Sequence, residues 1–462
     1  MVNYETIASI IFFTLLTIFI STKKKNLDVK KFLSNLYFAM YRTSWGLKAM
    51  DSLANKFRKL WTYLGYLAII VGFLGMIFIF YIIISGVFNI FAKPESAPPV
   101  GLVLPLPIQV PGIFGIKFSY WIISIFVIAL VHEFSHGLIA RTHKMKVKSS
   151  GFAFIGASLR LISLVIIFFS AVGKIKDSVY GCSSFFTFNF YSFSSYDFWL
   201  LVGIVLFGLS FFKSLWVPII PVAFVEPDEK MLRKRPYKEQ LSVFAAGPFS
   251  NILITIVLVL IGSYFIFPFK DNSIEPNGIK ITDYTREKCL KFPVENTGIA
   301  IGEVIQAIDN HPVLYFDNLS TIIKTKKPDD YIIIKTDKSS YEIKLARNPK
   351  NESQAYIGAY LGQSAKIKDN VKEKYGVFLP SFLIWLSGLL EMLIILNLGI
   401  GMFNLLPAGP LDGGRMYQLV MQKVFGKKNG DNVLKHTSLF LLVILLIYIS
   451  IIIKNVILSI LS

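Results

Sequence analysis

The chain has 462 residues, of which 54% are hydrophobic and only 17% are charged, and its mean hydropathy is +0.57. This composition excludes an ordinary soluble protein, and several apolar runs longer than 18 residues indicate membrane-spanning helices. The net charge of +19 lies mainly in loops beside these runs, where the positive-inside rule expects basic residues. Because the chain has no RNP-like or zinc-finger pattern, we expect no nucleic-acid partner.

Eight apolar segments predict a polytopic α-helical membrane protein. They lie at residues 7–21, 63–90, 118–140, 159–173, 198–220, 241–267, 378–403 and 437–460. The first segment lacks the basic start and the small-residue cleavage site of a signal peptide, so we expect a retained helix. The fourth segment carries Arg160 and follows GFAFIGA, a stretch that is also compatible with a re-entrant strand.

The charge of the loops predicts the orientation of these helices. Segment 22–61 carries ten Lys and Arg residues, whereas segment 93–117 carries only two. Segments 141–149, 226–240 and 404–436 also have a basic excess. Alternating eight helices places every basic loop on the cytoplasmic side and both termini outside. We therefore expect an integral, multi-pass protein of the cell membrane.

Residues 268–365 differ from the rest of the chain. They are polar, punctuated by Gly and Pro, and alternate between apolar and polar residues in DDYIIIKTDKSSYEIKLAR, a pattern typical of β-strands. The sequence thus predicts a small β-rich domain on the extracytoplasmic side. We expect four parts: N-terminal helices with a basic loop at 1–117, a first half of a membrane core at 118–267, this domain, and a second half at 366–462.

The stretch ALVHEFSHGLIAR ends the third apolar segment with the pattern H-E-x-x-H. Residues four apart share a helix face, so His132 and His136 can hold one zinc ion while Glu133 reaches a water molecule beside it. Zinc lowers the pKa of such a water, and the carboxylate takes its proton. The pattern is also compatible with two histidines that meet lipid headgroups, but ionisable residues inside membrane segments are usually functional.

A third metal ligand is available from GMFNLLPAGPLDGGR, which follows the apolar run at 378–400. Its prolines break the helix and its glycines allow a sharp turn. The carboxylate of Asp412 must then face protein or water rather than lipid. Two histidines and one carboxylate form a catalytic zinc set, although Asp412 alone is equally compatible with a turn or a helix cap.

HEFSHG together with NLLPAGPLDGG resembles the site-2 proteases, a family of intramembrane zinc metalloproteases, and AFVEPDEK at 223–230 resembles its archaeal branch. The resemblance implies one zinc ion per chain, held by His132, His136 and Asp412, and Glu133 as the catalytic base. It also implies membrane-spanning protein substrates, cut within or near their transmembrane segments in regulated intramembrane proteolysis. The sequence departs from the compact family pattern at 157–217, where two additional membrane runs are inserted.

Two asparagines match further motifs of that family. Asn251 lies in AAGPFSNIL, four residues after Gly247, and Asn404 begins NLLPAGPLDGG. The resemblance implies that they hold the substrate backbone or stabilise the oxyanion, although hydrogen bonds between helices would also explain them. ENTGIAIGEVIQAIDNHPV at 295–313 resembles PDZ domains, which implies that the β-rich domain binds a peptide ligand by strand addition.

Two other functions remain open at this point. A membrane metal transporter also carries His and Asp in its helices, but it does not need a glutamate beside the first histidine. A non-catalytic scaffold would act through the PDZ-like domain and would be expected to have lost a catalytic residue. For a protease, we also expect the broken backbone around 404–414 and the edge of GFAFIG to pair with an unwound substrate strand. Cys182 and Cys289 form no Cys-x-x-Cys motif, and their spacing alone does not decide whether they are disulfide-linked.

Overall fold

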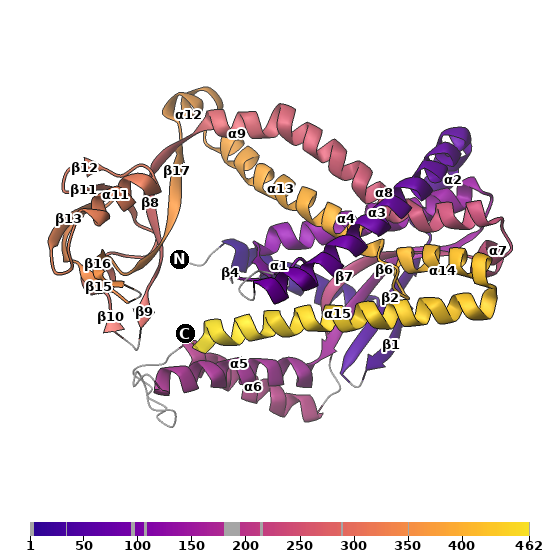
Figure 1. Cartoon of the computed structure of the whole chain (residues 1–462), viewed down its shortest axis with the longest axis horizontal. Coiled ribbons are helices and arrows are strands. Elements are labelled where there is room, and N and C mark those ends of the chain that lie inside the picture. Colours follow the sequence, from indigo (N-terminus) through magenta and orange to yellow (C-terminus); the bar gives the residue numbers. More distant parts are fainter. Residues whose placement is uncertain are drawn as a thin grey trace. The chain divides into compact units, whose positions relative to one another are not determined.

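The structure is a computed structural model that describes residues 4–33, 35–93, 98–105, 109–179, 195–212, 216–287, 290–349 and 351–461 (Figure 1). Cys182 and Cys289 lie outside the described residues. The chain divides into two units, which we describe separately. The first comprises residues 1–169, 198–262 and 388–461, and the second is formed mainly by residues 170–197 and 263–387.

The first unit contains long apolar helices and several shorter helices of mixed composition. They are α1 (Tyr4–Thr22), α2 (Leu47–Lys56), α3 (Arg58–Ala92), α4 (Phe118–Thr142), α5 (Leu159–Val179), α6 (Ser195–Phe212), α7 (Glu229–Arg233), α8 (Tyr237–Ile261), α13 (Phe378–Asn404), α14 (Asp412–Phe425) and α15 (Lys427–Leu461). The ends of α5, α6 and α13 belong to the second unit.

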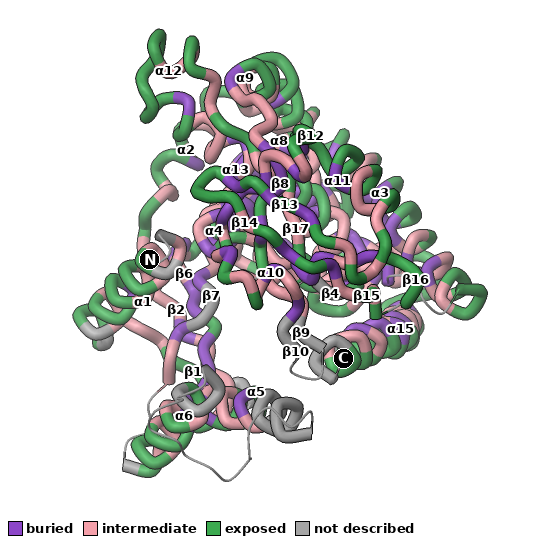
Figure 2. Tube along the Cα trace, turned by 90° about the vertical axis from the view of Figure 1, so that its left-hand side faces the viewer, coloured by how far each residue is buried: buried purple, intermediate pink, exposed green. Residues whose placement is uncertain are grey.

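Within the described part of the chain, five helices are long and apolar enough to cross a membrane, rather than the eight expected. They are α3, α4, α8 with its continuation to Ser273, α13 and α15. The apolar parts of α1, α5 and α6 are shorter, at Ile7–Ile20, Leu159–Ala171 and Trp199–Phe211. These lengths support an integral membrane protein, and Figure 2 shows many exposed residues, in green, along α1.

The prediction of one apolar helix over 198–220 is wrong at its second half. The helix α6 ends at Phe212, and residues 216–220 belong to strand β7 (Trp216–Pro227). Pro218 and Pro221 lie in this segment, and proline disfavours the interior of a helix because it lacks an N–H and clashes with the preceding turn.

A four-stranded antiparallel sheet completes the first unit. Its strands are β1 (Leu27–Leu33), β2 (Leu36–Thr43), β6 (Val147–Ser158) and β7, in the order β1-β2-β6-β7. The stretch GFAFIG lies in β6, between β2 and β7, so the prediction that it offers a free edge is wrong. The two edge strands are β1 and β7. A smaller sheet, β3 (Leu102–Leu104), β5 (Ile113–Gly115) and β4 (Gln109–Val110), precedes α4.

The helices α5 and α6 are inserted at the end of the β6–β7 pair. Ser158 at the end of β6 is paired with Trp216 at the start of β7, so the chain leaves and re-enters the sheet at one place. The guanidinium of Arg160 lies 4.6 Å from the ring centre of Phe211, which joins the two helices by a cation–π contact. The insertion therefore lengthens the end of a hairpin. The two strands stay paired back to Val147 and Pro227, with register shifts between Val147 and Ser149 and between Ile155 and Gly156.

The helix α4 lies between α8 and β7, which both pack against it, and α3 covers α8 closely. Buried glycines on α3 allow this approach: added Cβ atoms would lie 3.3 Å from Ser242 at Gly65 and 2.9 Å from Met416 at Gly72. Small residues let membrane helices pack backbone to backbone. This packing fixes the position of α8 relative to α14, which also contacts it.

The second unit contains the β-rich domain. Its main sheet has the order β14-β13-β11-β8-β17, with β12 paired to β11. The strands are β8 (Ile274–Tyr284), β11 (Val304–Ile308), β12 (His311–Pro312), β13 (Tyr331–Thr336), β14 (Ser340–Lys344) and β17 (Ala359–Ile367). Two small pairs are β9 (Arg286–Glu287) with β10 (Leu290–Lys291) and β15 (Ala346–Asn348) with β16 (Asn351–Tyr356).

Four short helices accompany these strands: α9 (Phe267–Ser273), α10 (Pro293–Asn296), α11 (Phe316–Lys324) and α12 (Asp369–Tyr375). The core of the domain is aliphatic and includes Ile281, Ile305 and Ile332, each almost completely buried. The alternation expected in DDYIIIKTDKSSYEIKLAR is present, because β13 alternates strictly between exposed and buried residues and pairs with β14.

Candidate metal centre

His132, Glu133 and His136 lie in the second half of α4, and the two histidines are buried, at 7% and 9% exposed. Their Nε2 atoms are 3.2 Å apart. Because four residues make slightly more than one helical turn, both imidazoles lie on the face of α4 that packs against α8.

Asp412 is the first residue of α14 and follows the loop that ends α13. Two glycines after it allow the loop to fold tightly against the new helix: an added Cβ at Gly413 would collide with the backbone of Leu405, and one at Gly414 with the backbone of Ala408. These close backbone approaches bring the carboxylate to α4. Oδ2 of Asp412 lies 3.0 Å from Nε2 of His132 and 3.3 Å from Nε2 of His136.

The three ligand atoms fit a single metal ion. Tetrahedral ligands at about 2.0–2.1 Å from zinc are separated from one another by about 3.3 Å, and the observed separations are 3.0, 3.2 and 3.3 Å. Among the described residues, this is the one group of three or more His, Cys, Asp or Glu side chains placed to hold a metal ion.

Gly247 on α8 provides a second test of the fit. An added Cβ at this position would lie 2.6 Å from Nε2 of His132 and closer still to Nε2 of His136. The space that the missing side chain leaves therefore adjoins both ligand nitrogens. A metal ion about 2 Å from each nitrogen needs such space.

The other ring nitrogens of both histidines also contact α8. Nδ1 of His136 is 2.7 Å from the carbonyl oxygen of Val243, and Nδ1 of His132 is 3.2 Å from the side-chain amide of Asn251. Asn251 is completely buried. The family resemblance implied that Asn251 holds the substrate backbone or stabilises the oxyanion, whereas the structure places its side chain against a predicted metal ligand. Sequence analysis missed the contribution of Val243, because a backbone carbonyl leaves no signal in a motif.

Glu133 points away from this contact with α8. Its Oε2 accepts a hydrogen bond from the backbone N–H of Val225 on β7, at 3.0 Å. Glu133, His136 and Asp412 line one cavity of about 580 Å³, which also borders Val225 and Arg415. The carboxylate is thus held at the wall of a cavity that reaches two of the three metal-ligand candidates.

Asn404 is the last residue of α13 and is half-buried. Within the described residues, its side chain makes no hydrogen bond, so the structure does not join it to the cluster. His143, just after the end of α4, is only 9% exposed, and its Nε2 lies 3.0 Å from Oγ of Ser242. His311 and His436 are exposed.

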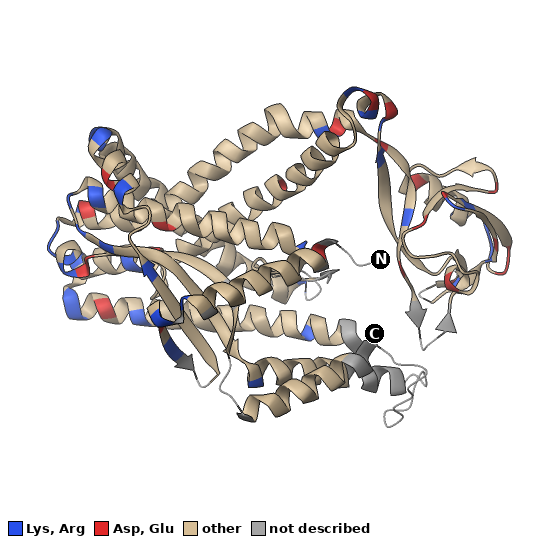
Figure 3. Ribbon diagram, turned by 180° about the vertical axis from the view of Figure 1, so that it is seen from behind, with Lys and Arg blue, Asp and Glu red and all other residues tan. Residues whose placement is uncertain are grey.

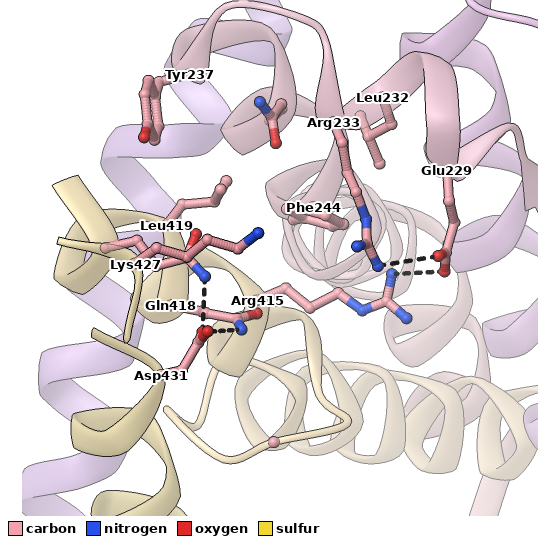
Figure 4. A pocket seen from close by; sticks show the side chains of 13 residues that line it. Glu229, Leu232, Arg233, Tyr237, Phe244, Arg415, Gln418, Leu419, Lys427 and Asp431 are labelled. Atoms are coloured by element: carbon pink, nitrogen blue, oxygen red, sulfur yellow. Dashed lines mark hydrogen bonds and ion pairs between the residues drawn. The ribbon is translucent and has the colours of Figure 1, made fainter. Parts of the chain in front are cut away.

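A second cavity, of about 450 Å³, lies beside the first and is shown in Figure 4. Arg415 and Phe244 border both cavities. The guanidinium of Arg415 lies 5.5 Å from the ring centre of Phe244 and 3.9 Å from Glu229. Also in the lining of this cavity, Asp431 accepts hydrogen bonds from Gln418 and Gln422, both at 2.7 Å.

Comparison with known proteins agrees with this geometry. Residues 120–448 match the family described as peptidase family M50. The chain belongs to this family of site-2-type metalloproteases. The resemblance noted in the sequence is thereby confirmed.

Individual relatives give less information about this chain than the family match does. An uncharacterized protein of Methanocaldococcus jannaschii is 23% identical over 400 residues, which cover 85% of this chain and 80% of that protein. Among solved structures, the PDZ domain of an SdrC-like protein from Listeria monocytogenes is 20% identical and covers 18% of this chain and 87% of its own, with a TM-score of 0.16.

Proposed function

We propose that this chain is a zinc endopeptidase that hydrolyses peptide bonds within or near transmembrane segments of membrane-anchored proteins. The observation that carries the proposal is the cluster of His132, His136 and Asp412, with Glu133 on the same apolar helix. A bound zinc ion would supply Lewis-acid chemistry, polarising the substrate carbonyl and making water more acidic.

The protein groups would perform the proton transfers. Glu133 would accept a proton from the attacking water and then deliver it to the leaving nitrogen. The hydrogen bond from the Val225 N–H fixes the direction of its carboxylate. His132, His136 and Asp412 would hold the metal ion without taking part in proton transfer.

Substrate recognition would begin at β7. A transmembrane helix must unwind before its carbonyl groups can be attacked, and an unwound segment can pair with a strand that has a free edge. β7 has a neighbouring strand on one side only, and it reaches the cavity at Val225. This proposal replaces the earlier expectation for GFAFIG.

The transporter and scaffold alternatives have less support. A transport path needs successive polar sites, whereas one metal-ligating cluster is found among the described residues. A scaffold would not need Glu133 at a cavity wall beside three ligand candidates. We also propose that the β-rich domain binds peptides in the manner of a PDZ domain. Such binding would determine which substrates reach the membrane core.

The test uses purified full-length protein and a set of synthetic transmembrane peptides with helix-destabilising residues at different depths. We expect cleavage inside the apolar segment, its loss with a zinc chelator, and its recovery when zinc is returned. If the zinc-loaded protein cuts no peptide but moves zinc across vesicle membranes, these results would instead support the transporter.

A further inference from the structure

One face of α8 supports the proposed metal ligands at three successive turns. Val243, Gly247 and Asn251 are each four residues apart, so they lie along one side of the helix. Val243 offers a carbonyl to His136, Gly247 leaves space beside both Nε2 atoms, and Asn251 meets His132. Both imidazole rings are thus held between the metal position and α8.

The direction of the His132 ring decides what Asn251 must do. Nε2 of His132 faces Oδ2 of Asp412 and Nε2 of His136, so it is the nitrogen available to a metal ion. A histidine that binds a metal through one nitrogen carries its proton on the other and donates it to a neighbour. Nδ1 of His132 must therefore be a donor, and the group 3.2 Å away is the amide of Asn251.

The amide of Asn251 can supply the acceptor that this proton needs. Its Nδ2 is placed toward His132, and its Oδ1 is buried with no hydrogen-bond partner among the described residues. The two ends of an amide have nearly the same shape, so the hydrogen-bond network decides their assignment. Turning the amide by a half-rotation places Oδ1 against the Nδ1–H of His132 and removes a contact between two donors.

The backbone of Asn251 is itself held in place. Its carbonyl oxygen accepts hydrogen bonds from Nδ2 of Asn397 at 2.8 Å and from Oγ1 of Thr255 at 2.9 Å. Asn397 and Thr255 are buried. These bonds fix the turn of α8 that carries the amide, so the side chain has little freedom to reach a substrate instead.

We infer that Asn251 is a positioning residue that fixes the orientation of the proposed ligand His132, rather than a group that binds the substrate or the oxyanion. This inference rests on the proposed function, because it assumes that the cluster holds zinc. The amide oxygen accepts the Nδ1 proton of His132 and directs Nε2 toward the metal ion.

The test compares the zinc affinity of the full-length protein with that of three variants. Asn251→Leu removes the acceptor, and we expect zinc to bind about 10- to 100-fold more weakly, as is usual for the loss of such a partner. Asn251→Asp keeps an acceptor oxygen and should retain most of the affinity. Thr255→Val is the matched control, because it changes the same network one turn away without touching His132. The absorption spectrum of the cobalt-substituted protein reports the ligand geometry independently of activity.

The outcomes separate this inference from the proposed function. A wild-type protein that binds no zinc overturns the proposed function itself. If the wild-type protein binds zinc and Asn251→Leu binds it equally well but cleaves more slowly, Asn251 acts on the substrate and the inference is wrong. Equal losses in Asn251→Leu and Asn251→Asp would also contradict it. Asn251→Ala repeats the comparison with a smaller side chain if the leucine variant does not fold.

Discussion

Gly247 shows how strongly the metal centre depends on the absence of one side chain. An added Cβ would come close to the Nε2 atoms of both His132 and His136, in the space that a metal ion needs. We expect Gly247→Ala to lose zinc binding, and therefore cleavage, while the helix still forms. Metal analysis of the purified variant checks this. Gly399→Ala is the control, because a Cβ there has no atom within 4 Å; zinc retained by the Gly247 variant would count against the proposed metal position.

At the residue scale, the sequence named the side chains that the structure brings together. His132 and His136 are one helical turn apart, so local spacing was enough to select them. Asp412 was selected because it lies on interrupted backbone in a chain that also carries H-E-x-x-H, and because the paired motifs resemble those of the site-2 proteases. The partners on α8 were not predictable in the same way, because contacts of Val243 and Asn251 with α4 depend on how two distant helices pack. A motif identifies Asn251 but does not reveal which group it faces.

Among the elements, the turn between β11 and β12 combines backbone and charge effects. Asp309 and Asn310 both have positive φ, which suits the two-residue turn of a hairpin. The carboxylate of Asp309 accepts hydrogen bonds from Lys326 at 2.6 Å and from the N–H of Ile333 at 2.8 Å. Burial opposes the charge, but these partners outweigh it and lower the pKa of Asp309 below its ordinary value.

The turn therefore predicts a pH-dependent difference between the wild-type protein and Asp309→Asn. A carboxylate with a lowered pKa stabilises the fold above its unfolded pKa and loses this effect as the pH falls through the folded pKa. At neutral pH we expect the variant to be less stable by about 1 kcal/mol, and we expect the difference to shrink below about pH 4. Hydrogen exchange of β11 and β13 in the full chain measures it. A difference that stays constant down to pH 2 would contradict the role of the charge.

Predictions for whole elements depended on how regular their pattern is. The alternation at 331–344 predicted strands because every second residue is buried against the domain core. Strands β1 and β2 were not predicted, since Leu27–Thr43 is basic and read as a loop. The pairing of β2 with β6, and of β1 with β2, stabilises a segment whose own pattern is weak. The prediction for the second half of segment 198–220 was wrong because length and hydrophobicity were given more weight than Pro218.

At the scale of the whole molecule, the orientation predicted from loop charge does not require eight spans. If α1 does not cross the membrane and α5 and α6 act as a pair, the remaining five helices still place segments 22–61, 141–149, 226–240 and 404–436 on one side. In Figure 3, the blue ribbon segments that mark Lys and Arg are concentrated at the end of the first unit that carries α2, α7 and the start of α15. This end is therefore predicted to be cytoplasmic.

The same orientation predicts that the β-rich domain lies outside the cytoplasm. Ser339 is exposed in the turn between β13 and β14. A single cysteine at this position, with the two native cysteines replaced, should react with a membrane-impermeant thiol reagent in intact cells. A cysteine at exposed Lys428 serves as the opposite control and should react only after lysis. The reverse pattern would show that the orientation is inverted.

The β-rich domain should be separable from the metal centre. Its first and last strands are adjacent, because Ile274 is paired with Ile367, so a short glycine linker can replace residues 274–367. None of the proposed ligands lies in this segment. We expect the shortened protein to keep its zinc and to change which substrates it cleaves. Loss of zinc from a shortened protein that is otherwise folded would contradict this division of roles.

The most direct test of the central claim separates the base from the ligands. If His132, His136 and Asp412 hold zinc, Glu133 serves only to transfer protons. Glu133→Gln keeps the size of the side chain but removes the base, so zinc should remain near one per chain while cleavage falls by at least about a hundredfold. Asp412→Ala should instead weaken zinc binding, because a ligand is lost. Zinc content and peptide cleavage are measured on the same purified samples. A Glu133→Gln protein that cleaves at the wild-type rate would contradict the metalloprotease mechanism.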